Sequence, residues 1–156
     1  MRFKIAVVED EKQSADILIG YIKRYAKEHN EDIDVVYFSD GDEIVYEYKP
    51  IYDIIFLDIE MRLLDGMTTA EHIRKLDKDV ILIFVTNMTQ YAVKGYAVDA
   101  LSYLLKPVPY FAFSQELKRA FTKLKKRENN YIMFSIQDGV IRLNTADILY
   151  IESMKH

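Results

Sequence analysis

Residues 54–66 read IIFLDIEMRLLDG, and this stretch decides the fold. It opens with a run of large apolar residues, and the acid Asp58 follows that run at once. A continuous apolar run of this length is typical of a strand buried on both faces of a parallel sheet. Ligands of such sheets bind beyond the carboxyl ends of the strands, so Asp58 is the first candidate site residue.

Similar apolar runs elsewhere in the chain are predicted to be further strands of the same sheet. They lie at residues 3–8, 80–85 and 101–105. Residues 33–37 form a more mixed run that contains Asp34. We therefore expect this last strand nearer an edge of the sheet.

Helical patterns fill the intervals between the strands. Ala15, Leu18, Ile22 and Tyr25 recur at helical spacing, with Ser14 as a candidate N-cap. Further helices are expected within residues 42–49, around Ala70, Ile73 and Leu76, at residues 89–94, and along Phe113, Leu117, Phe121 and Leu124. This alternation of strand and helix predicts a doubly wound α/β fold, with helices on both faces of a parallel sheet.

The composition limits the chemistry that the chain can perform. It has 156 residues, half of them apolar, a formal net charge of -4 and no cysteine. The lack of cysteine excludes disulfides, thiolate metal sites and cysteine nucleophiles, and the mild negative charge argues against a dominant nucleic-acid-binding surface. Residues 1–9 contain too short an apolar run for a signal peptide, and no apolar stretch approaches the length of a membrane span. We therefore expect a cytoplasmic protein without membrane contact.

Polar residues follow four of the expected strands. They are Glu9, Asp10 and Glu11 after the first strand, Asp58 after the third, Thr86 and Asn87 after the fourth, and Lys106 and Pro107 after the fifth. Each of them alone would be an ordinary turn, cap or surface residue. Strand ends that meet at one edge of a sheet, however, bring these carboxylates, a hydroxyl and an ammonium into one crevice.

This set of groups suits a phosphoryl acceptor. Neighbouring carboxylates repel each other unless they bind a proton or a cation, and oxygen ligands without histidine or cysteine favour Mg²⁺. The cation neutralises an incoming phosphoryl group, which a carboxylate accepts as an aspartyl phosphate. A hydroxyl and an ammonium then bind the phosphoryl oxygens.

Several short motifs occur in a fixed order along the chain. They are the pair Glu9-Asp10, the run Phe56-Leu57-Asp58-Ile59-Glu60-Met61, then Gly66, Thr86 and the run Tyr103-Leu104-Leu105-Lys106-Pro107. This ordered set resembles the receiver domain of two-component response regulators, over residues 3–127. The resemblance implies a flavodoxin-like sheet of five parallel strands in the order 2-1-3-4-5.

The resemblance also implies a role for each acidic residue. Asp58 would accept a phosphoryl group from a histidine kinase, in a signalling domain rather than an enzyme. Asp10 and Asp58 would bind Mg²⁺ directly, together with the backbone carbonyl of Glu60. Glu9 would assist through a water molecule.

The remaining motif residues would detect the phosphate. Thr86 and Lys106 would contact the phosphoryl oxygens, and the Lys106–Pro107 peptide bond would be cis. Tyr103 would turn inward when Thr86 moves toward the phosphate, and the surface of the fourth helix, fifth strand and fifth helix would change. Phosphorylation would then favour a homodimer through the fourth helix and fifth strand. The alternative for Tyr103 is an ordinary half-buried aromatic residue.

Two residues depart from the family pattern. Arg62 stands where receivers usually have proline, and Asn87 stands where a small residue is common. Arg62 would leave the loop after Asp58 more mobile and attract anions. Asn87 would narrow access to Asp58 or hydrogen-bond to the phosphoryl group. Both put the rates of phosphorylation and dephosphorylation in question, but not the choice of Asp58.

The C-terminal part is expected to be a second segment. Residues 127–130 are the expected linker, so that the receiver domain covers residues 1–127 and the second segment residues 128–156. A turn at Asp138-Gly139 between two apolar runs predicts a β-hairpin. Residues 146–153 resemble the opening of a LytTR-type DNA-binding domain. Since a segment this short cannot bury a core, we expect the intact parent to be a transcription regulator that binds DNA only through its complete output domain.

Three alternatives stay open. A phosphohydrolase of the haloacid dehalogenase type also uses an Asp nucleophile, and Asp58, Glu60, Thr86 and Lys106 mimic its set. In that family, however, the nucleophile follows the first strand and a further acidic pair follows the lysine. A binding module that signals without phosphate would tolerate the loss of Asp58 or Lys106. A nucleotide-binding protein would need a glycine-rich phosphate loop, which this sequence lacks.

Overall fold

A five-stranded parallel sheet forms the centre of the protein in a computed structural model that describes residues 1–129 and 131–145. The strands are β1 (Arg2–Val8), β2 (Asp32–Phe38), β3 (Ile54–Leu57), β4 (Ile81–Thr86) and β5 (Ser102–Leu105). Their order across the sheet is β2-β1-β3-β4-β5. The predicted fold class and strand order are therefore confirmed.

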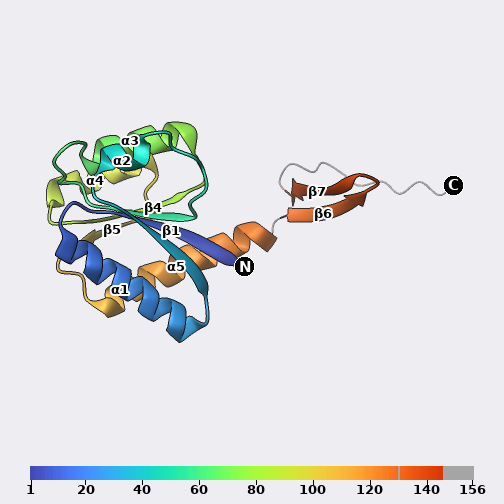
Figure 1. Cartoon of the computed structure of the whole chain (residues 1–156), viewed down its shortest axis with the longest axis horizontal. Helices are drawn as coiled ribbons and strands as arrows, with labels where there is room; N and C mark the ends of the chain where they lie inside the picture. The colour runs from blue at the N-terminus through green and yellow to red at the C-terminus, as the bar shows by residue number, and fades with distance from the viewer. Residues whose placement is uncertain (130, 146–156) are drawn as a thin grey trace. The chain divides into compact units, whose positions relative to one another are not determined.

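Helices cover both faces of this sheet. They are α1 (Lys12–His29), α2 (Gly41–Val45), α3 (Gly66–Leu76), α4 (Ala92–Gly95) and α5 (Tyr110–Asn129), with single 3-10 turns at Thr89–Tyr91 and Tyr96–Val98. Figure 1 shows α1 and the first part of α5 on one face, and α2, α3 and α4 on the other. Within the described residues, no helix is both long enough and apolar enough to cross a membrane.

Burial explains the character of each strand. Every residue of β3 and β4 is buried, which agrees with their unbroken apolar sequences. The strand β2 is only partly buried and lies at an edge, as its mixed sequence predicted. Between the sheet and α5, the rings of Phe56 and Phe113 stack with their centroids 5.0 Å apart. This packing fixes α5 beneath the strand that ends in Asp58.

Two helix boundaries differ from the prediction. Ser14 is not an N-cap, because α1 begins at Lys12 and Glu11 occupies the cap position. The side chain of Glu9 accepts a hydrogen bond from the Glu11 backbone N–H, so the chain turns into the helix earlier than the pattern indicated. The helix α2 ends at Val45, well short of residue 49, and Glu47 then takes a left-handed backbone conformation with φ of 50°.

The expected linker is also partly helical. Residues 127–129 continue α5, because neither glycine nor proline interrupts the helix there. Basic residues at this end interact favourably with the negative end of the helix dipole. The predicted boundary between the domains therefore falls inside a continuous helix.

The chain divides into two compact units, residues 1–120 and residues 121–156. The second unit contains the antiparallel pair β6 (Tyr131–Ile136) and β7 (Gly139–Asn144), which form the predicted hairpin. Apolar side chains of both strands, including Met133 and Val140, are exposed. Residues 146–153, which carry the LytTR resemblance, lie outside the described residues.

Candidate phosphoacceptor site

The register of the sheet brings the ends of four strands to one edge. Val8 pairs with Leu57, and Thr86 pairs with Leu105. The residues that follow stay linked through the backbone: the Asp58 N–H donates to the Val8 carbonyl at 3.1 Å, and the Lys106 N–H donates to the Thr86 carbonyl at 2.9 Å. Their side chains consequently meet in one crevice at the carboxyl end of the sheet.

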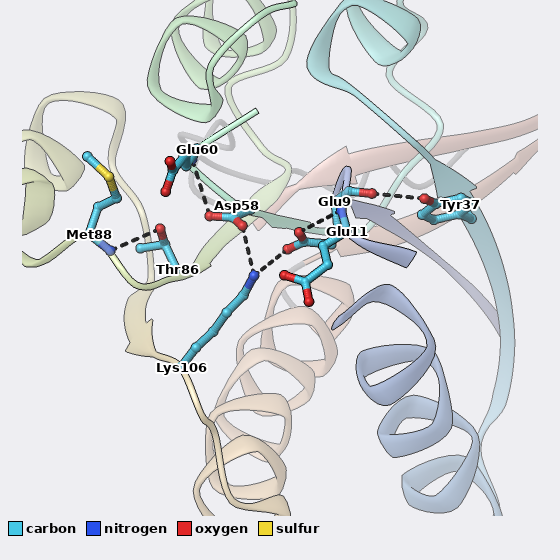
Figure 2. A network of polar contacts seen from close by, with 8 residues as sticks. All are labelled: Glu9, Glu11, Tyr37, Asp58, Glu60, Thr86, Met88 and Lys106. Carbon is cyan, nitrogen blue, oxygen red and sulfur yellow. Dashed lines mark hydrogen bonds and ion pairs between the residues drawn. The ribbon is translucent and has the colours of Figure 1, made fainter. Parts of the chain in front are cut away.

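Lys106 forms the centre of this crevice. Its Nζ atom lies 2.7 Å from Glu9 Oε2 and 2.8 Å from Asp58 Oδ2. Figure 2 shows the lysine reaching from the end of β5 to a position between the two carboxylates. Both carboxylates are buried, and the lysine side chain is only 12% exposed. Because little water screens these contacts, the ammonium is a strong partner for any negative charge that forms on Asp58.

The charges in this site perturb one another. Burial raises the pKa of Glu9 to about 7; the Asp58 carboxylate adds to the rise, and Lys106 opposes it. Burial works to lower the pKa of Lys106, but its hydrogen bonds to Asp58 and Glu9 outweigh burial and raise that pKa above the ordinary value. The lysine therefore stays an ammonium at neutral pH. A cation bound nearby would favour the charged form of Glu9 and lower its raised pKa.

The acidic residues are arranged in a way that suits a divalent cation. One carboxylate oxygen from each of Glu9, Asp10 and Asp58 can be chosen so that all lie within 4.8 Å of one another. Asp10 is more exposed than the other two. Glu60 lies beside Asp58, and its backbone N–H donates to Asp58 Oδ1 at 3.3 Å. An all-oxygen set with a solvent-accessible side fits Mg²⁺, which keeps several waters in protein sites.

Thr86 and Tyr103 both contact the backbone of Met88. The fully buried Thr86 accepts the Met88 N–H on its Oγ1 at 3.2 Å, and the Tyr103 hydroxyl donates to the Met88 carbonyl. The Tyr103 ring also packs against Phe84, with the centroids 5.8 Å apart. Tyr103 thus contacts the loop that follows β4, and Met88 lies between it and Thr86.

The loop after Asp58 returns very close to it. A Cβ atom on Gly66 would lie 1.9 Å from the Asp58 carbonyl oxygen, so only glycine fits there. The Gly66 N–H donates to the Ile59 carbonyl at 2.8 Å. The preceding Asp65 caps α3 by accepting the Thr68 N–H at 2.9 Å. Gly66 and Asp65 together therefore fix where α3 starts.

The structure places the remaining predicted residues as follows. The Lys106–Pro107 peptide bond is cis. Arg62 is exposed and lines a hollow of about 670 Å³ that Asp10 also lines. Asn87 is exposed and lines a separate hollow of about 330 Å³ together with Lys106. Their effects on phosphorylation rates stay predictions.

Sequence reasoning missed two residues around the crevice. Tyr37 donates its hydroxyl proton to the Glu9 carbonyl at 2.9 Å and so steadies the end of β1. Asp40 is buried and accepts backbone N–H groups from the loop that follows Asp58. The pair Asp40-Gly41 directly after the second expected strand was the available signal, since an acid before glycine marks a tight turn or a cap.

Comparison with known proteins identifies the family. Residues 5–118 match the family described as the response regulator receiver domain. The chain is 28% identical to the sensory transduction protein LytT of Bacillus anthracis, over 95% of this chain and 65% of that protein. It is 29% identical to the transcriptional regulatory protein YpdB of Escherichia coli strain K12, over 96% of this chain and 65% of that protein. The chain thus spans about two thirds of the length of these relatives.

Solved structures agree with this result. The response regulatory domain of protein mrkE from Klebsiella pneumoniae superposes with a TM-score of 0.70 at 26% identity, over 80% of this chain and 99% of that one. The REC domain of AraT, a response regulator from Geobacillus stearothermophilus, shares the fold with a TM-score of 0.71 at 22% identity, over 82% of this chain and 99% of that one. The haloacid dehalogenase alternative therefore loses its basis. The chain belongs to the response regulator receiver domain family, and it is a signalling domain of the two-component type.

Proposed function

We propose that this domain accepts a phosphoryl group on Asp58 from a histidine kinase and transmits the resulting change of shape. One observation carries the proposal: the Lys106 ammonium binds Asp58 and Glu9 together in a buried crevice at the ends of parallel strands. Such a kinase would meet this domain in the cytoplasm.

The chemistry follows from the groups present. An Asp58 carboxylate oxygen attacks the phosphorus of a phosphohistidine, the bond from phosphorus to nitrogen breaks, and the imidazole leaves with its electron pair. Asp10, Asp58 and the Glu60 carbonyl would hold Mg²⁺, with Glu9 acting through water. When bound, this ion neutralises charge on the phosphoryl oxygens. Lys106 exchanges its contact with the Asp58 carboxylate for one with a phosphoryl oxygen.

The signal would leave the site through Thr86. In donating its hydroxyl to a phosphoryl oxygen, Thr86 would shift toward Asp58 and weaken the hydrogen bond that its Oγ1 accepts from the Met88 N–H in this structure. The Met88 carbonyl, in the following peptide group, accepts the Tyr103 hydroxyl, so displacement of Met88 would change how the tyrosine is held. The change then reaches α4 and β5, which flank these residues in the chain.

The direct test is the mass of the intact chain after incubation with acetyl phosphate and Mg²⁺. We expect one added phosphoryl group in the wild type and none in Asp58→Asn. Asp16→Asn is the matched control, because Asp16 is an exposed acid on α1 whose Oδ1 atom lies 3.0 Å from Lys12 Nζ. The control should be phosphorylated like the wild type. A wild-type chain that gains no mass would contradict the proposal.

A further inference from the structure

We propose that Asp40 is a positioning residue for the Mg²⁺ and phosphoryl site, because it clamps the loop that carries Glu60. The proposal rests on the function proposed above and names a residue of the same site. Asp40 lies on the turn between β2 and α2, remote in sequence from the loop that it binds.

Both carboxylate oxygens of Asp40 accept hydrogen bonds from the backbone of this loop. Asp40 Oδ2 accepts the Leu63 N–H at 3.0 Å, and Asp40 Oδ1 accepts the Leu64 N–H at 2.9 Å. The residue is only 5% exposed. Burial works to raise the pKa of Asp40, but hydrogen bonds from backbone amides, foremost those of Leu64 and Leu63, outweigh it and hold that pKa below its usual value. The carboxylate is thus charged and fully engaged.

Side-chain burial does little to hold the crest of this loop. Leu63 is 74% exposed, and Arg62 is exposed as well. At the base, the Gly66 N–H binds the Ile59 carbonyl and closes the loop. Met61 packs against the core before the crest, and the backbone contacts to Asp40 restrain the exposed part that follows it.

Asp40 is itself held in place. A Cβ atom on the neighbouring Gly41 would lie 1.9 Å from Thr69 Oγ1 and 2.7 Å from the Leu64 carbonyl oxygen. The start of α2 therefore packs directly against both the loop and α3. A rigid acceptor of this kind can transmit its position to the loop, since neither partner has room to shift.

The restrained loop includes a group of the site. Glu60 precedes Leu63 by only three residues, and its backbone N–H contacts Asp58 Oδ1. If the crest loosens, the Glu60 peptide gains freedom, and the carbonyl proposed as a Mg²⁺ ligand is no longer pre-oriented. Residues that orient metal ligands typically contribute about 10-fold or more to metal affinity.

The test is Mg²⁺ affinity, measured by calorimetric titration of three variants of the full chain. We expect Asp40→Asn to weaken Mg²⁺ binding roughly 10-fold, because the amide presents only one acceptor to two N–H groups. Asp40→Glu keeps the charge but displaces the carboxylate, so it should weaken binding too. Glu43→Gln removes the charge of an exposed acid that lines the same hollow and binds Ser39 rather than the loop after Asp58, and it should change the affinity less than twofold.

If Asp40→Asn and Glu43→Gln lost the same Mg²⁺ affinity while Asp40→Glu kept all of it, the loss would come from the missing negative charge alone. That result would overturn the proposal. Wild-type affinity in Asp40→Asn would overturn it as well. If the wild type binds Mg²⁺ and is phosphorylated, only the role of Asp40 is at stake. If it does neither, the proposed function itself fails.

A measurement on the wild type covers the case in which the Asp40 variants do not fold. Since binding and loop order are linked reciprocally, saturating Mg²⁺ should slow hydrogen exchange at the Leu63 and Leu64 amides. The Thr68 amide, which is held by the Asp65 cap, is the internal reference. Exchange at Leu63 and Leu64 that Mg²⁺ leaves unchanged relative to Thr68 would contradict the clamp.

Discussion

At the scale of single residues, the crevice depends on charged groups that are in contact before any ligand binds. The Lys106 ammonium lies between the buried carboxyl groups of Glu9 and Asp58, and it can offset only one of their two possible negative charges. Breaking such a set by removing one partner leaves an uncompensated buried charge, which costs far more than the pair contributes. A bound cation and a phosphoryl group would replace the ion pairs of Lys106 by new ion pairs, so that no buried charge would lose its partner.

The lowered pKa of Asp40 also leads to a prediction about the stability of the fold. Its pKa in the folded protein is lowered, so its contribution to stability is present above the unfolded pKa of about 3.9 and is lost as the pH falls through the folded value. At pH 7 we expect Asp40→Asn to lower the free energy of unfolding by about 1–3 kcal/mol, because one backbone N–H loses its acceptor.

Urea unfolding at pH 7 and at pH 3 checks this expectation. The difference between wild type and Asp40→Asn should shrink at the lower pH, where the wild-type carboxylate begins to take up its proton. Glu43→Gln, whose amide oxygen can still accept one of the two hydrogen bonds from Ser39, should show a smaller difference than Asp40→Asn at pH 7. A difference that is as large at pH 3 as at pH 7 would mean that the charge of Asp40 is not its source.

At the scale of elements, the sequence predicted the sheet well because its signals are local. The unbroken apolar runs of β3 and β4 reflect burial on both faces, and the site residues follow from where those runs end. Helix boundaries were harder. The start of α1 depends on the Glu9 side chain binding the Glu11 amide, and such a contact leaves no periodic trace in the sequence. Asp40 was missed for the same reason, since its partners lie more than 20 residues away.

The elements α4 and β5 are the proposed site of the dimer. Exposed apolar side chains occur on or beside each of them, including Val93, Tyr96 and Leu105. Exposed apolar groups of this size mark interaction surfaces more often than chance when they gather on one face. We therefore expect phosphorylation to shift the chain toward a dimer.

Sedimentation velocity with and without acetyl phosphate and Mg²⁺ checks the dimer. Val93→Lys should abolish the shift without preventing phosphorylation, because Val93 is 79% exposed on α4. Tyr46→Lys changes an equally exposed side chain just after α2 and should leave the shift intact. An unchanged sedimentation profile of the phosphorylated wild type would reject the dimer, and equal losses in both variants would reject its location.

At the scale of the whole molecule, the receiver domain has a hydrophobic core of its own, and the described side chains of the hairpin form none. The receiver buries a continuous core on both sides of its sheet. The hairpin exposes Met133, Ile136, Val140 and Leu143, and a lone two-stranded pair is marginally stable in water. The relatives LytT and YpdB extend well beyond the matched region. We propose that these strands open a LytTR-type output domain of a transcription regulator, whose remainder would cover their apolar faces.

This proposal predicts how the chain behaves toward DNA. Residues 1–156 should show no sequence-selective binding in a gel-shift assay, because the hairpin alone offers neither a packed core nor a basic surface: of its described residues, Arg142 is the only Lys or Arg. The second sample in the assay is a chain extended to the length of the relatives. We expect this longer chain to bind DNA selectively, and more tightly after treatment with acetyl phosphate and Mg²⁺. Tight selective binding by residues 1–156 would contradict the idea that the output domain has to be complete. An extended chain that binds no DNA, phosphorylated or not, would contradict the LytTR assignment while leaving the receiver chemistry untouched.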